Sequence, residues 1–169
     1  MNKDLIALIL SFATLVLIQV TLFNNMNIFG FINPMIYLLF LVIYRFDSDQ
    51  TIFILISFML GFCIDFLSQS GGAHTIASLT ISFLRPSLIK YSFGVTSEIP
   101  STFQNDSRTI NKFLFLGLLI GIHHLLYFII IYFNWSASYL ILKNVILTSV
   151  FSLILIALVS TFYKKLNDS

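Results

Sequence analysis

Six apolar runs, separated only by short polar or Gly/Pro-marked breaks, constrain what this chain can fold into. They cover 5–23, 28–44, 51–67, 73–91, 113–133 and 139–163. About 20 apolar residues in a helix cross the roughly 30 Å of hydrocarbon in a bilayer, so these runs predict membrane-spanning helices. Only 9% of the 169 residues are charged, whereas soluble domains carry about 25%. We therefore predict an all-α polytopic membrane protein, with six transmembrane helices in a single domain over 1–169.

Two of the six runs are weaker than the others. The run over 28–44 is short and opens with Gly30 and Pro34, and the run over 73–91 is diluted by "TIASLTIS" and interrupted by Arg85-Pro86. Either run is also compatible with a re-entrant or tilted segment. The first run is expected to stay in the mature protein, because "QVTLFNNMN" offers no small-residue cleavage site.

The basic residues predict the orientation of the helices, because cytoplasmic loops hold an excess of Lys and Arg. With the N-terminus inside, every basic residue except Lys143 falls at a cytoplasmic helix end. These residues are Lys3, Arg45, Arg85, Lys90, Arg108, Lys112, Lys164 and Lys165. The breaks at 24–27, 68–72 and 134–138 contain no basic residue and are predicted to face outward. Both termini and the polar loop over 92–112 are therefore expected in the cytoplasm.

Several function classes find no support in the sequence. The net charge of +2, without a basic groove studded with aromatic residues, argues against nucleic-acid binding. Cys63 is the only cysteine, which excludes a disulfide framework and a cysteine metal cluster. His123 and His124 are adjacent and so point about 100° apart on a helix, with no acidic residue in that run to complete a metal site. No nucleophile motif is present, so we expect no catalytic, cofactor or metal residues.

The stretch "GFCIDFLSQSGGAHTIA" places a carboxylate and an imidazole at the two ends of a tight turn. Asp65 falls in the last turn of the third helix and His74 in the first turn of the fourth, at similar depth near the outer boundary. One interpretation is a wet interfacial aspartate, with Gly71 and Gly72 merely allowing the turn. The other is that Asp65 fixes the hairpin by accepting hydrogen bonds from the turn amides or from His74, and so shapes an outward surface for a partner.

The remaining polar residues within the apolar runs have mainly structural interpretations. We expect His123 and His124 to be neutral and hydrogen-bonded to neighbouring helices, with a proton relay as the alternative. Gln19 is expected to form a helix–helix hydrogen bond. Arg85 is expected to extend to the cytoplasmic headgroups, and Pro86 to break or kink the fourth helix.

The order of several motifs along nearly the whole chain resembles one bacterial family. "QVTLF" is followed by "FGFINPMIYLLFLV", "GFCIDFLSQSGGAHTIA" and "FLRP", and the later "IHHLLYF" fits one branch of the same family. Together with the six-helix size, this order resembles MreD, the rod shape-determining membrane protein. The polar loop over 92–112 is less typical of that family.

The resemblance implies a non-enzymatic scaffold in the bacterial inner membrane that serves lateral peptidoglycan synthesis. The partners it implies are the bitopic protein MreC, the actin-like filament protein MreB, the peptidoglycan polymerase and transpeptidase, and membrane lipids. The family also resembles in shape the S components of vitamin transporters, six-helix proteins with an outward-facing ligand pocket. The alternative function is therefore a substrate-binding S component, and Asp65, His74 and Gln19 suit either role.

Overall fold

The computed structural model describes residues 3–45, 49–94, 103 and 108–167, and this part of the chain is helical, with one isolated bridge between Ile28 and Ile32 and no named strand. The elements are α1 (Lys3–Thr21), η1 (Phe23–Asn25), α2 (Leu38–Ile43), α3 (Gln50–Ser68), α4 (Ala73–Phe93), α5 (Thr109–Tyr132), η2 (Trp135–Ala137) and α6 (Ser138–Asn167). Most of the predicted loop over 92–112 lies outside the described residues.

Four helical segments in the described part are long and apolar enough to cross a membrane. They are Leu5–Asn25, Gln50–Ser68, Thr109–Tyr132 and Trp135–Phe162. Their outer surfaces carry large apolar side chains, such as Leu10 and Leu55, each 60% exposed. Exposed apolar surface on this scale marks contact with lipid or with other proteins. The prediction of a helical, multi-pass membrane protein is confirmed at this level.

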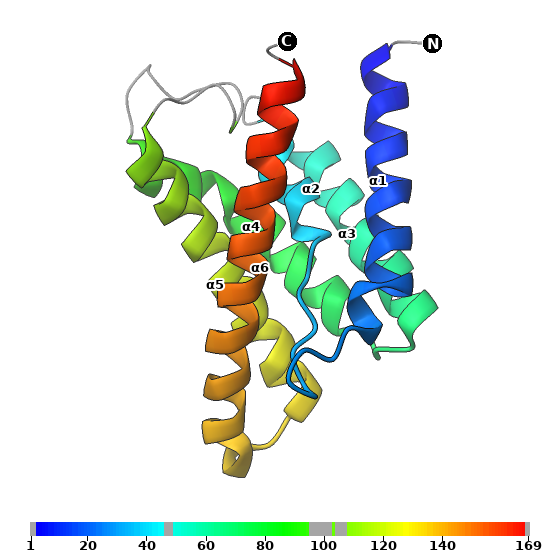
Figure 1. The fold of residues 1–169 in the computed structure, drawn as a ribbon, viewed down its shortest axis with the longest axis vertical. Helices are drawn as coiled ribbons and strands as arrows, with labels where there is room; N and C mark the ends of the chain where they lie inside the picture. Colours follow the sequence, from blue (N-terminus) through cyan, green and yellow to red (C-terminus); the bar gives the residue numbers. More distant parts are fainter. Residues whose placement is uncertain (1–2, 46–48, 95–102, 104–107, 168–169) are drawn as a thin grey trace.

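From α3 onward, successive long helices run in opposite directions and pack mainly against their neighbours in sequence (Figure 1). Contacts join α3 to α4, α4 to α5 and α5 to α6, while α1 packs on α3 and on α2. The start of α1 and the end of α6 lie at the same end of the molecule (Figure 1). The hairpin of α5 and α6 extends furthest toward the opposite end (Figure 1).

The predicted second transmembrane helix over 28–44 is wrong in this form, because only Leu38–Ile43 is helical. The chain before α2 turns through a short bridge between Ile28 and Ile32, then returns without regular structure through the middle of the molecule (Figure 1). Asn27, Phe29 and Gly30 have positive φ in this turn. Three left-handed residues so close together, with Pro34 following, prevent a continuous helix.

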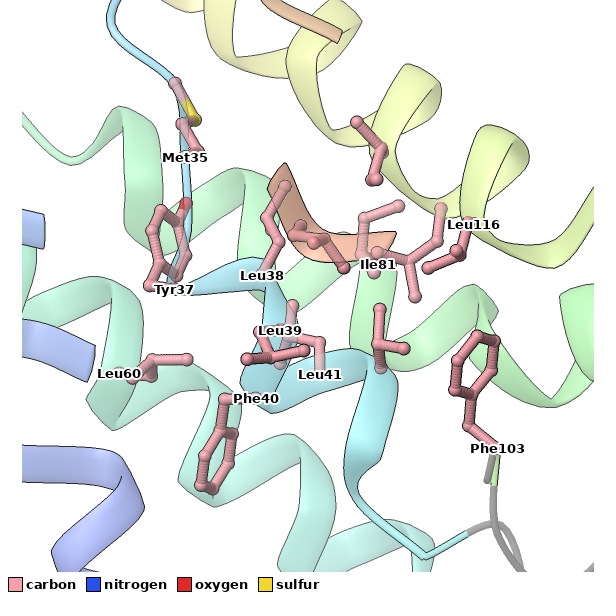
Figure 2. Packing of buried hydrophobic residues seen from close by; sticks show 14 of the residues in the cluster. Met35, Tyr37, Leu38, Leu39, Phe40, Leu41, Leu60, Ile81, Phe103 and Leu116 are labelled. Carbon is pink, nitrogen blue, oxygen red and sulfur yellow. The ribbon is translucent and has the colours of Figure 1, made fainter. Parts of the chain in front are cut away.

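Residues 35–42 form the centre of the hydrophobic core. All of them are buried, and Tyr37, Leu38, Leu41 and Val42 have no exposed surface. Figure 2 shows these side chains packed between residues of other helices, including Leu60 of α3 and Leu116 of α5. Residues 35–42 are surrounded by protein, so their apolar composition does not indicate contact with lipid.

The predicted break at Pro86 is absent, because α4 continues through it to Phe93. A proline within a helix has no N–H for the carbonyl four residues earlier, which here belongs to Ser82. The side-chain amide of Gln50 in α3 donates to this carbonyl at 2.7 Å. A neighbouring helix thus supplies the missing hydrogen bond, and α4 tolerates its proline.

Candidate functional site

Asp65 lies in the last turn of α3, and its carboxylate caps the start of α4. Oδ1 accepts from the backbone amide of His74 at 3.1 Å, and Oδ2 accepts from the amide of Thr75 at 2.7 Å. The hydroxyls of Ser70 and Thr75 each donate to it at 2.5 Å. The first amides of a helix have no partner within the helix and favour negative charge, so a carboxylate from the preceding helix satisfies both needs.

This arrangement requires α3 and α4 to approach closely one turn before Asp65. A Cβ added to Gly61 would lie 2.6 Å from the Thr75 Cα and 2.7 Å from the His74 carbonyl oxygen. Gly71 and Gly72, with φ of +67° and +90°, form the turn in the left-handed region that glycine adopts freely. Neither glycine amide donates to the carboxylate in the described contacts, so the expected turn-amide bonds come instead from His74 and Thr75.

Gln19 of α1 is fully buried and forms hydrogen bonds with the irregular chain before α2. Its Nε2 donates to the Pro34 carbonyl at 3.3 Å and to the Asn24 side chain at 2.8 Å, and its Oε1 accepts from the Tyr37 amide at 3.3 Å. From the other side, the Ser152 hydroxyl of α6 accepts from the Met35 amide at 2.9 Å. Irregular backbone inside a membrane protein needs such internal partners.

The Tyr37 hydroxyl links two histidines that the sequence places far apart. It lies 3.0 Å from Nδ1 of His74 and 2.7 Å from Nε2 of His123. All three side chains are at least 98% buried, since their exposures are 0% for Tyr37, 2% for His74 and 0% for His123. The rings also pack edge to face, with His74 and His123 each about 5.5 Å from Tyr37 between centroids.

His124 points to a different neighbour and belongs to a second chain of hydrogen bonds. Its Nδ1 lies 2.7 Å from the Ile120 carbonyl, which can only accept, so Nδ1 carries the proton. Nε2 then accepts from the Ser152 hydroxyl at 3.4 Å. The two adjacent histidines therefore bond to separate parts of the fold, His123 to Tyr37 and His124 to α6. No group of three potential metal ligands occurs among the described residues.

A pocket of about 530 Å³ opens beside this network, at the end of the molecule opposite the termini. Its lining comes from the end of α1 and η1, the irregular chain before α2, the end of α3 with the turn and the start of α4, and the C-terminal part of α5. The lining residues are Val20, Asn24, Asn25, Phe31, Asn33, Met35, Leu67, Ser68, Ser70, His74, Tyr127 and Phe128. An amide of Asn24 bonded to the Ser68 hydroxyl at 2.7 Å ties the two sides together.

Arg85 does not reach the headgroups, contrary to the sequence-based expectation. Its side chain is 2% exposed, and its guanidinium lies 4.4 Å from the centroid of the Phe53 ring. It donates to the backbone carbonyls of Tyr44 and Arg45, just beyond the end of α2. A short helix surrounded by protein leaves carbonyls without partners at its C-terminus, and Arg85 satisfies them. Gln19 therefore holds the N-terminal end of α2, and Arg85 holds its C-terminal end.

Sequence reasoning found some members of this site and missed others. Asp65, His74, Gly71, Gly72, Gln19 and Pro34 do gather at one end of the molecule, and His123 reaches the same network through Tyr37. Tyr37, Thr75 and Ser152 were missed, because hydroxyl residues are common in apolar helices and carry no spacing signal. The signal for Tyr37 was the Pro34 three residues before it, which indicates interrupted helix where a polar side chain has backbone groups to serve.

No family model, no curated protein and no solved structure matches this chain.

Proposed function

We propose that this protein is a non-enzymatic scaffold of the machinery that builds lateral peptidoglycan, acting in the bacterial inner membrane. It would bind an MreC-like bitopic protein and, through it, an MreB-like filament system and the peptidoglycan polymerase and transpeptidase. The order of the motifs that resemble MreD supports this proposal. The observation that carries it is that the buried polar side chains of those motifs hold the fold together.

Each motif contributes one structural contact. Gln19 of "QVTLF" donates to the irregular backbone before α2, and Asp65 of the "GFCIDF" stretch caps α4. Arg85 of "FLRP" donates to a backbone carbonyl at the C-terminus of α2. Gln19 and Asp65 used in this way give the end of the bundle opposite the termini a defined shape, which a partner protein requires. A scaffold function needs nothing more than such a surface.

The proposal includes six membrane crossings with both termini in the cytoplasm. The four apolar helices supply four crossings, α4 a fifth, and the irregular chain with α2 a sixth that is shielded by protein. The common location of the two chain ends fits an even number of crossings (Figure 1). An architecture like that of the transporter S components follows from the same proposal.

Depletion combined with affinity purification tests the scaffold role. We expect depleted cells to become round or swollen, and the tagged protein to co-purify from mild detergent with MreC-like and wall-synthesis proteins. Normal cell shape after complete loss would contradict the proposal.

The second candidate is a substrate-binding S component, and the pocket of about 530 Å³ favours it. That volume is within the range of small-molecule sites. Co-purification with ATP-binding cassette subunits, and loss of uptake of one vitamin on depletion, would support the transport function instead.

A further inference from the structure

The pocket at the end opposite the termini is lined by a residue with a polar atom to which no described residue bonds. His74 is 2% exposed and lines the pocket. Its Nδ1 is engaged by the Tyr37 hydroxyl, whereas no described group bonds to its Nε2. Nε2 is not one of the buried atoms that lack a partner, so it is accessible and available to a ligand in the pocket that His74 lines.

The hydrogen bonds of Tyr37 decide whether Nε2 of His74 is a donor or an acceptor. The hydroxyl has one proton, and the only hydrogen bonds it makes to described residues are with the two histidine nitrogens, since the nearby Ser78 Oγ has no hydrogen-bond partner among them. It therefore donates to one histidine and accepts from the other. Nδ1 of His123 is buried without a partner. If Tyr37 donated to His123, that Nδ1 would hold an orphaned N–H, and buried N–H groups without acceptors are rarer than unused acceptors. His123 therefore donates to Tyr37, Tyr37 donates to His74, and His74 carries its proton on Nε2.

The rest of the pocket is uncharged and presents groups that both donate and accept. Asn24 and Asn33 already make internal bonds, but an amide has two donor and two acceptor positions, so each retains capacity. The Tyr127 hydroxyl has no partner among the described residues, and its ring lies 4.6 Å from that of His74 between centroids. Phe128 adds a second aromatic side chain, and no Asp, Glu, Lys or Arg lines the pocket.

We propose that this pocket binds a neutral saccharide group, with an oxygen of the ligand accepting the hydrogen bond from Nε2 of His74. Sugar hydroxyls donate and accept as the asparagine amides do, and aromatic side chains cover the apolar face of a sugar ring. An anionic ligand would be left without a counter-ion in a partly buried pocket, and for a cationic ligand the nearby Asp65 carboxylate already accepts four hydrogen bonds from the α3–α4 turn and the start of α4. The sugar could come from a soluble molecule or from the headgroup of a glycolipid, which share this chemistry. The site goes beyond the scaffold function and would exist whether or not that function is correct.

Binding is tested with the full chain in phosphatidylcholine nanodiscs. In the first arm, calorimetry measures binding of N-acetylglucosamine, with glucosamine as the cationic match that lacks the carbonyl. In the second arm, the thermal midpoint is compared between nanodiscs with and without monoglucosyl diacylglycerol. We expect a response to at least one neutral sugar probe and none to glucosamine.

Two variants locate the binding in this pocket. Tyr127→Phe removes the free hydroxyl and keeps the ring, and His74→Asn keeps a polar atom near the Nδ1 position while removing the Nε2 donor. Each should weaken binding about two- to tenfold, the effect of one lost hydrogen bond. Tyr139→Phe, at a residue 80% exposed and outside the pocket, is the matched control and should bind as the wild type does.

Each outcome has a defined meaning. A response only in the first arm identifies a soluble sugar, and a response only in the second identifies a glycolipid headgroup. No response to either neutral probe, equal binding of glucosamine, or unchanged affinity in a folded Tyr127→Phe protein would overturn the proposal. The helical circular dichroism and thermal midpoint of each variant without ligand show whether it is folded. These results do not depend on the cell-shape experiment, so the two proposals can fail separately.

Discussion

At the scale of single residues, the charged and polar side chains in the apolar runs form hydrogen bonds mainly with backbone amides and carbonyls. Asp65 accepts from the first amides of α4, and Arg85 donates to a carbonyl at the end of α2. Gln19 and Ser152 form hydrogen bonds with the irregular chain before α2. Without these partners the same backbone groups would lack hydrogen bonds in a setting where water is scarce, at a cost of several kcal/mol each. Each of these side chains is therefore expected to affect stability more than an ordinary surface residue.

Asp65→Leu should lower the free energy of unfolding by about 2–3 kcal/mol, because hydrogen bonds to a charged group contribute about that much and the α4 amides would be left unpaired. Leucine is otherwise favourable in a lipid-facing helix. Asp65→Asn keeps one acceptor oxygen and should cost about 1 kcal/mol. Thermal unfolding in detergent measures both values.

The matched control for this prediction is Asp49→Leu. Asp49 is exposed and caps its own helix, accepting from the amides of Thr51 and Ile52. Loss of such a local cap typically costs about 1 kcal/mol. If Asp65→Leu were no more destabilising than Asp49→Leu, the contacts to the neighbouring helix would not add to those of an ordinary cap.

At the scale of elements, two features set how α4 packs: its close approach to α3 at Gly61 and its proline at position 86. Both use α3 as the partner, one through the absence of a side chain and the other through the Gln50 amide. In the α3–α4 hairpin, the part farther from the termini depends on a small residue, Gly61, and the part nearer the termini depends on a polar one, Gln50.

Gly61→Ala should destabilise the protein by about 1–3 kcal/mol, because its Cβ would overlap the backbone at Thr75 and force the two helices apart. Gly117→Ala and Gly121→Ala in α5 are the controls, since nothing lies within 4 Å of a Cβ at either position. Alanine there should be neutral or stabilising by up to about 1 kcal/mol. Equal effects at Gly61 and Gly117 would contradict the close approach.

Gln50→Leu should cost about 1 kcal/mol in the wild-type protein, because the Ser82 carbonyl loses its donor. In a Pro86→Ala background the new amide at residue 86 can bond to that carbonyl, so the same substitution should have little effect. A double-mutant cycle on thermal unfolding measures this coupling. Additive effects of the two substitutions would show that Gln50 does not compensate for the proline.

Five of the six predicted helices correspond to long helices of the structure, whereas the run over 28–44 does not. Apolar run length predicted α1, α3, α4, α5 and α6 within a few residues. The run over 28–44 is similarly apolar, but its residues 35–42 are buried in protein, and composition cannot distinguish burial in protein from burial in lipid. For Arg85 the charge alone suggested a headgroup contact, because the carbonyls it bonds to exist only when α2 is short.

At the scale of the whole molecule, the charge asymmetry of the loops predicts an orientation in the membrane that the fold alone does not indicate. Ile110 at the start of α5 is 82% exposed, and Ser136 in η2 is exposed near the opposite end. In a Cys63→Ala background, a membrane-impermeant thiol reagent applied to intact cells should modify Ser136→Cys and not Ile110→Cys. Labelling at Ile110→Cys alone would reverse the predicted orientation.

The irregular chain before α2 also has a consequence for how the protein is made. Its Met35 amide depends on Ser152, which lies 117 residues later in the chain. During synthesis this segment would emerge long before α6 exists, with its backbone unable to enter lipid alone. We therefore expect the segment to remain at the translocon or in water until the last helix is inserted. In a chain stalled on the ribosome before α6, the first helices would then be membrane-bound, whereas residues 35–42 would not yet be packed in the core.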